Sequence, residues 1–237
     1  MNSTTHALTR RRFIAASSAT AGSLVVGFHI PTGAQQAATP NAAEINAWVM
    51  IKPDETVVIR VARSEMGQGT LTGLAQLVAE ELECDWARVT TEYPTPGQNL
   101  ARNRVWGNFS TGGSRGIRES QDYVRKGGAA ARMMLVQAAA AGWGVPATEC
   151  RAASSVITHG PSGRSTSFGK VAAAAAKLSA PTDVALKDPK DWKLAGRRLA
   201  RLDTVEKTTG KLVYGADLKL PGLLNAGQFQ VGAVDQK

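Results

Sequence analysis

The chain has 237 residues, of which 43% are hydrophobic and 20% are charged, a composition typical of a globular protein of one or two domains. Its formal net charge is +9, but the basic residues are scattered and no nucleic-acid-binding motif occurs, so we do not expect nucleic acid as a partner. Cys84 and Cys150 are far apart in the chain, whereas zinc and iron–sulfur sites need closely spaced thiolates. The chain is therefore expected to carry no such cluster of its own, and the two thiols are interpreted as buried or idle.

The first 34 residues have the pattern of an export signal. Residues 9–14 read Thr-Arg-Arg-Arg-Phe-Ile, a twin-arginine motif in which Arg10, Arg11 and Phe13 are the expected signal residues. The weakly apolar stretch that follows is rich in Ser, Thr and Gly and is too short to span a bilayer, which needs about 20 predominantly apolar residues. We expect a signal peptide over residues 1–34, a periplasmic location and no stable membrane span. A disordered basic tail or a mitochondrial-type transit peptide is the alternative.

The chain after the signal predicts an α+β fold. Residues 47–51 and 56–61 alternate apolar with small or polar residues around a turn that contains a proline, which predicts a β-hairpin. The apolar residues of 70–83 recur on one face of a helix, and Thr70 is the expected cap of that helix. A strand is expected at 89–93.

Between residues 94 and 178 the pattern alternates loops with helices. Residues 94–108 are rich in Pro, Gly, Asn and Arg and predict a long loop. The Ala-rich run 117–141 predicts a helix that ends at Gly142. His159 lies in a polar stretch and is interpreted as a loop residue rather than a ligand. Shorter elements are expected after the long helix: a turn into a short helix at 144–150, a strand at 155–158, a hairpin turn at 162–164 and a helix at 168–178.

The last part of the chain predicts a connector and the start of a new unit. Residues 180–200 contain two prolines and several charged residues and are interpreted as an inter-domain connector. Strands are expected at 211–214 and 226–231. Two strands without further partners leave edges unpaired, so we expect the unit that contains them to be incomplete.

The segment most indicative of a ligand site is Gly67-Gln68-Gly69, directly before the helix at 70–83. Two glycines around one amide residue let the backbone come close to a ligand, and the N–H groups at the helix start then point at whatever is bound. The alternative is a turn that only connects a strand to a helix. Glu65, just before it, is interpreted as a turn residue beside the ligand site and not as a catalytic base.

Three longer strings resemble one protein family. Residues 64–82 resemble the pterin-binding segment of the xanthine oxidase family of molybdenum hydroxylases. Residues 110–114, Ser-Thr-Gly-Gly-Ser, with the long helix that follows, are similar to the second pterin-side segment of that family. Residues 201–222, with Arg-Leu-Asp at their start and Leu-Pro-Gly at their end, are similar to the start of its hammerhead domain. The order of the segments resembles the branch of isoquinoline 1-oxidoreductase beta subunits and aldehyde dehydrogenase molybdenum-binding subunits.

This resemblance implies a domain plan. Residues 45–180 would form the N-terminal portion of a molybdopterin-binding domain, 181–200 a connector, and 201–237 the incomplete start of an α/β hammerhead domain. The chain would be an N-terminal fragment of a large subunit and inactive on its own. Two other interpretations stay open: a non-functional truncated remnant, and a stand-alone exported binding module.

The resemblance also implies a function. The complete subunit would bind molybdopterin, in its cytosine dinucleotide form and with molybdenum, and would hydroxylate N-heterocycles or aldehydes with oxygen derived from water. Electrons would pass to a small 2Fe–2S subunit and then to a cytochrome c acceptor. No catalytic or metal-ligating residue is assigned in this chain, and Arg115 either pairs with a cofactor phosphate or faces solvent. The cofactor-binding residues implied by the resemblance are Gly67, Gln68, Gly69, Gly112, Gly113 and Ser114.

Overall fold

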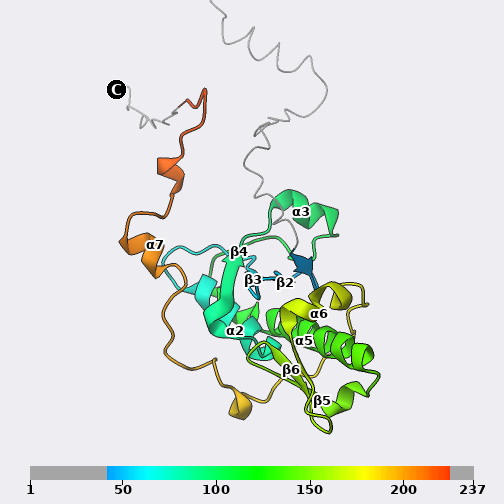
Figure 1. Ribbon diagram of the computed structural model, residues 1–237. Helices are drawn as coiled ribbons and strands as arrows, with labels where there is room; N and C mark the ends of the chain where they lie inside the picture. Colours follow the sequence, from blue (N-terminus) through cyan, green and yellow to red (C-terminus); the bar gives the residue numbers. More distant parts are fainter. Residues whose placement is uncertain (1–41, 225–237) are drawn as a thin grey trace, which may run out of the picture. The chain divides into compact units, whose positions relative to one another are not determined.

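The computed structural model of the protein describes residues 42–224, which form two sheets and a set of helices around them (Figure 1). This confirms the mixed α and β class. The signal over residues 1–34 and the strand expected at 226–231 lie outside the described residues.

The first sheet has four strands in the order β1 (Ala43–Glu44), β2 (Val49–Ile51), β3 (Val57–Arg60) and β4 (Val89–Glu92). The predicted hairpin is confirmed, because β2 and β3 pair antiparallel. β3 and β4 pair in parallel, and the crossover between them contains α2 (Thr70–Leu82). Every residue of β2 and β3 is buried, as expected of strands that are covered on both faces. The short 3₁₀ helix η2 (Trp86–Arg88) leads into β4.

The centre of the fold is the contact between α2 and the long helix α5 (Gln121–Trp143). A Cβ atom at Gly128 would lie 2.4 Å from the carbonyl oxygen of Val78, so only glycine allows the two helix backbones to come this close. The prediction of one helix over 117–141 needs correction, because a separate short helix, α4 (Arg115–Arg118), precedes α5. The expected end at Gly142 is also wrong: Gly144 ends the helix with a φ of 68°.

A second sheet follows, with β5 (Cys150–Ala153), β6 (Val156–His159) and β7 (Ser165–Ser167) in antiparallel order. The 3₁₀ helix η3 (Ala147–Glu149) precedes it, and α6 (Phe168–Ala175) follows it at the predicted position.

The interpretation of His159 as a loop residue is wrong. Its side chain is buried at the end of β6, where Nδ1 lies 2.6 Å from Ser162 Oγ and Nε2 lies 2.8 Å from Glu149 Oε2. Because both ring nitrogens have protein partners, the ring ties η3 to the hairpin turn after β6.

The loop predicted at 94–108 contains a helix, α3 (Pro96–Ala101), which corrects that prediction. Thr95 accepts from the Gln98 N–H, and the Gln98 side chain accepts from the Thr95 N–H, so the helix begins with a capping box.

The connector (residues 181–200) has no strand and one short 3₁₀ helix, η4 (Pro189–Asp191). After it come α7 (Thr204–Thr208) and η5 (Gly215–Asp217). The strand predicted at 211–214 is wrong, since within the described ranges no other strand runs beside these residues to complete a ladder.

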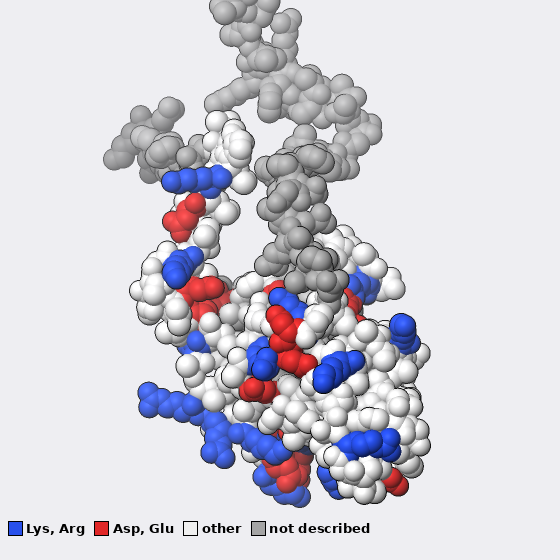
Figure 2. Space-filling view, in the orientation of Figure 1, with Lys and Arg blue, Asp and Glu red and all other residues white. Residues whose placement is uncertain are grey.

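Buried hydrophobic side chains from both sheets and the main helices form one core cluster. Cys84 and Cys150 are buried within it and are not joined to each other, as expected of idle thiols, and burial raises the pKa of Cys84 to about 12. On the face that Figure 2 shows, lysine and arginine are interspersed with acidic and uncharged residues. Across residues 42–224, no helix is both long enough and apolar enough to cross a membrane.

Candidate functional site

The two glycine segments predicted from the sequence line one cavity. Its volume is about 440 Å³, within the range of about 300–1,000 Å³ typical of small-molecule sites. Four of the six predicted residues line it: Gln68, Gly112, Gly113 and Ser114. Arg115, for which the sequence left open a phosphate contact or a solvent-facing position, also lines the cavity, and the sequence interpretation missed the other lining residues, which are Met66, Thr70, Thr111, Gly116 and Ile117.

Hydrogen bonds hold the two segments side by side. The Ser64 N–H donates to Thr111 Oγ1 at 2.9 Å, and the guanidinium of Arg63 donates to the Ser110 carbonyl and, from Nε, to Ser120 Oγ at 2.9 Å. A Cβ atom at Gly116 would lie 3.1 Å from the Thr70 hydroxyl, so α4 packs closely on the start of α2. Contacts between the two segments themselves therefore hold the cavity walls together.

The glycines in and beside the cavity differ in the reason why a glycine is present. Gly67 and Gly69 have φ values of 101° and 84°, which other residues rarely adopt. Gly112 has no positive φ, and a Cβ atom there would meet no protein atom within 4 Å. Neither its backbone conformation nor its packing therefore requires a glycine at 112. Its missing side chain leaves room in the cavity for a ligand to approach the backbone.

The glycine turn (residues 65–69) is organised by the carboxylate of Glu65. Oε1 accepts from the N–H groups of Gly67 at 2.7 Å and Gly69 at 3.0 Å, while Oε2 accepts from the Leu71 N–H at 3.0 Å. Burial raises the pKa of Glu65, but these N–H donors and the nearby Arg201 outweigh burial and hold the pKa below its ordinary value.

Two expectations about the helix start are corrected by this arrangement. Thr70 is the first residue of α2 rather than its cap, since Gly69 occupies the cap position without a side-chain bond. Three N–H groups expected to face a ligand instead bind Glu65. Glu65 is a turn residue beside the cavity, as the sequence indicates.

The amide of Gln68 lies across the same turn. Its oxygen accepts from the Met66 N–H at 2.5 Å, and its nitrogen donates to the Ser64 carbonyl at 2.8 Å. A side-chain amide has two donor hydrogens and two acceptor lone pairs. One donor and one acceptor of this exposed side chain are thus left for a ligand.

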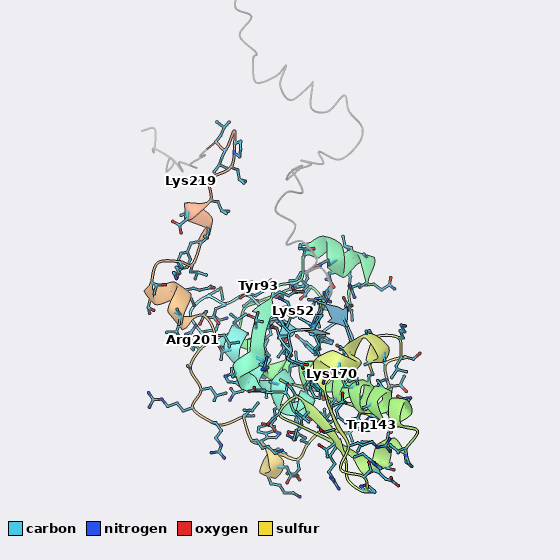
Figure 3. All side chains as sticks on the ribbon, in the orientation of Figure 1. Lys52, Tyr93, Trp143, Lys170, Arg201 and Lys219 are labelled. Atoms are coloured by element: carbon cyan, nitrogen blue, oxygen red, sulfur yellow. The ribbon has the colours of Figure 1, made fainter. Side chains whose placement is uncertain are left out.

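Arg201, which lies in the segment after the connector and is labelled in Figure 3, forms hydrogen bonds with the glycine turn. Its Nη2 lies 2.8 Å from Glu65 Oε1, and its Nη1 donates to the Gly67 carbonyl at 3.0 Å. Tyr93 contacts the same turn, because its hydroxyl accepts from the Glu65 N–H at 3.2 Å. The sequence places Arg201 in a family-like segment but gives no sign that it meets residues more than a hundred positions earlier.

Arg115 is the one charged residue among those of the described chain that line the cavity. Its Nε donates to the Gly112 carbonyl at 3.2 Å, and its side chain is about half exposed. The cavity thus combines a cation, an amide and exposed backbone next to glycines, a donor set that suits an anionic, ring-containing ligand such as a pterin with its phosphate.

Residues 5–217 match the family described as the molybdopterin cofactor-binding domain. The chain belongs to this molybdopterin cofactor-binding family. The match includes both segments that line the cavity and Arg201. It confirms the family that the sequence resembles.

Three curated relatives of this molybdopterin-binding chain are informative. It is 33% identical over 230 residues to the membrane-bound aldehyde dehydrogenase (pyrroloquinoline-quinone) of Gluconacetobacter polyoxogenes, covering 92% of this chain and 28% of that protein. It is 31% identical to the beta chain of isoquinoline 1-oxidoreductase from Brevundimonas diminuta, covering 92% and 33%. It is 29% identical to one of the subunits of nicotinate dehydrogenase from Pseudomonas putida KT2440, covering 79% and 15%. The chain thus spans a third or less of the length of these relatives.

Proposed function

We propose that this chain supplies one part of the molybdenum cofactor site in the large subunit of a hydroxylase that acts on N-heterocycles or aldehydes. The observation that carries the proposal is that segments 66–70 and 111–117, far apart in the sequence, line one cavity in a member of a molybdopterin-binding family. The substrate classes are supported by the names of the relatives, which include an isoquinoline oxidoreductase, a nicotinate dehydrogenase and an aldehyde dehydrogenase.

In this proposal the residues of the chain bind and orient the cofactor. Gln68 offers its remaining donor and acceptor to the edge of the pterin ring, and Arg115 pairs with a phosphate oxygen. Gly112 and Gly113 admit the ligand close to their backbone, with the Ser114 hydroxyl beside them. When bound, the cofactor supplies the redox chemistry that inserts a water-derived oxygen into the substrate. No residue of the described chain is given a catalytic role.

Three finer points belong to the same proposal. The cofactor is the cytosine dinucleotide form of molybdopterin. The electrons leave through a small 2Fe–2S subunit toward a cytochrome c, a proposal supported by relatives that are named as subunits. The protein is exported to the periplasm by the twin-arginine pathway, which the residues at 9–14 favour.

A valine at position 112 tests the cavity assignment. In the complete subunit, Gly112→Val is expected to lower the molybdenum and pterin content strongly, because its side chain projects into space that the ligand needs while meeting no protein atom within 4 Å. The melting temperature is expected to stay within a few degrees of the parent. Metal analysis by mass spectrometry and thermal unfolding measure the two quantities.

The matched control is Gly142→Val near the end of α5, where a Cβ atom also meets no atom within 4 Å and φ is likewise not positive. It is expected to keep full molybdenum content. Full occupancy in Gly112→Val would show that the cavity is not the cofactor site.

A further inference from the structure

The side chains of Glu65 and Gln68 form hydrogen bonds with the backbone of the glycine turn, but neither of them binds the carbonyl of Gly67. The Glu65 carboxylate accepts hydrogen bonds from three backbone N–H groups. Gly67 has a φ of 101°, and as a glycine it has no side chain whose packing would limit rotation of its backbone. A turn with two glycines has high conformational freedom, so its shape depends on which group binds the Gly67 carbonyl.

Arg201 bridges the carboxylate of Glu65 and the carbonyl of Gly67. Its two terminal nitrogens bind different groups of the turn, Nη2 the Glu65 carboxylate at 2.8 Å and Nη1 the Gly67 carbonyl at 3.0 Å. Because the guanidinium is planar and its donors are fixed in a fork, these two bonds set the distance between the carboxylate and the carbonyl. A lysine has a single nitrogen and does not reproduce this geometry.

Arg201 is itself held in place by its own segment. Asp203 is 6% exposed and accepts from Arg201 Nε at 3.1 Å and Nη2 at 3.2 Å. Lys207 on α7 pairs with Asp203, and the Leu202 N–H donates to Thr72 Oγ1 on α2 at 3.0 Å. Figure 1 shows α7 beside the loop that leads from β3 to α2. The guanidinium therefore meets the turn in a fixed orientation.

We propose that Arg201 is a positioning residue for the cofactor site: by bridging Glu65 and the Gly67 carbonyl it fixes the glycine turn, so that segment 201–207 must be docked for the cofactor to be held. Only the second half of this inference, that the docked segment is needed to hold the cofactor, rests on the proposed function. It assigns to the segment that follows the connector a part in forming the site, although none of its residues lines the cavity in the described chain.

Amide hydrogen exchange tests the bridge without the cofactor. The complete subunit and its Arg201→Met variant are produced in a host that makes no molybdenum cofactor, and exchange is followed at the amides of Gly67, Gly69 and Leu71. The variant is expected to exchange about 10-fold faster at these positions, as for the loss of a hydrogen bond to a charged group. Amides in the middle of α2, at Leu74 and Val78, are expected to keep the parent rate.

Two matched variants complete this test. Arg198→Met removes an exposed arginine three residues earlier and is expected to change none of these rates. Arg201→Lys keeps the charge without the bridge and is expected to give intermediate exchange. If Arg201→Met does not fold, the same comparison is made with Arg201→Lys. Parent-like exchange in a folded Arg201 variant, or uniform acceleration through α2, overturns the proposal.

The second half is tested with protein from a host that makes the cofactor. Arg201→Met is expected to lower molybdenum content about 10-fold, the lower end of the losses seen when groups that orient ligand-binding residues are removed. Parent-like molybdenum content in this variant overturns the role in holding the cofactor. A parent protein that contains no molybdenum would instead contradict the proposed function, while the exchange experiment would still decide whether Arg201 fixes the turn.

Discussion

Glu80 and Glu81 on α2 are buried carboxylates that bind the connector. Glu80 is 2% exposed, and its Oε2 accepts from the N–H groups of Lys193, Leu194 and Ala195 at 2.9, 2.5 and 3.0 Å. Its other oxygen pairs with the ammonium of Lys187. Because an unpaired buried carboxylate is costly, the energy of this site depends on the connector staying in contact with α2.

Replacement of Glu80 by Gln is expected to lower the free energy of unfolding by about 1–3 kcal/mol, since an amide offers one acceptor oxygen where the connector needs two. Burial raises the pKa of Glu80, but Lys187 and the three N–H donors outweigh burial and lower the pKa below its ordinary value of 4.5. The stabilisation is therefore fully present above pH 4.5 and is lost as the pH falls through the lower folded-state pKa.

Urea unfolding of the complete subunit and its variant at several pH values measures this effect. The difference between the two is expected to be largest near neutral pH and to shrink in acid. The control is Asp122→Asn, which removes an exposed ion pair with Lys126 on α5 and is expected to change stability by less than about 0.5 kcal/mol. A difference for Glu80→Gln that is the same at neutral and acidic pH would contradict the assignment to its carboxylate.

At the same residue scale, the sequence predicts the glycines of the turn but not what binds them. The positive φ values of Gly67 and Gly69 agree with a turn that needs glycine. The reach of Glu65 to the Leu71 N–H follows no periodic pattern, because it depends on the curvature of the turn itself. A free helix start was therefore expected where the chain supplies its own carboxylate.

At the scale of elements, prediction succeeded where the pattern of residues within one segment was sufficient to identify its secondary structure. The apolar periodicity of α2 and the two buried strands before it were sufficient, because core burial enforces both patterns. The helix α3 also had a local signal, since Thr95 and Gln98 form a capping box and Pro96 is the first residue of the helix. The loop-like composition of the surrounding residues concealed it.

Other elements depend on partners that no local pattern describes. The hairpin between β5 and β6 turns at Ser154 and Ser155, with φ values of 48° and 64°, where asparagine or glycine is usual. The residues at 211–214 have the composition of a strand, yet a strand forms only beside another one. Sheet membership is thus decided by tertiary pairing, and local composition alone led to the wrong prediction of a strand at 211–214.

At the scale of the whole molecule, the candidate site depends on three segments that the sequence identified separately. The resemblance named all three, but only the fold shows that residues 111–117 meet the glycine turn in one cavity and that Arg201 binds Glu65 and Gly67 of that turn. Contacts over such separations are fixed by the packing of α2 against α5, which brings α4 onto the start of α2.

Export is the first whole-molecule prediction. Replacement of both Arg10 and Arg11 by Lys is expected to leave the protein in the cytoplasm, because the twin-arginine pathway recognises the arginine pair. Cell fractionation with immunodetection measures the distribution. Arg12→Lys, at a neighbouring arginine outside the pair, is the control and is expected to be exported. Periplasmic protein at the parent yield in the double variant would show that residues 1–34 are not a signal of this class.

The second concerns the electron-accepting partner. The complete subunit is expected to co-purify with a small iron–sulfur protein. Metal analysis by mass spectrometry is expected to find iron only in preparations that contain this partner. The chain's own thiols are poor cluster ligands, because both are buried and burial raises the pKa of Cys84 to about 12, whereas metal binding needs thiolates. The double variant Cys84→Ala, Cys150→Ala is therefore expected to retain iron in full. Loss of iron from this variant would place the cluster on this chain, and an active enzyme without iron would exclude the partner.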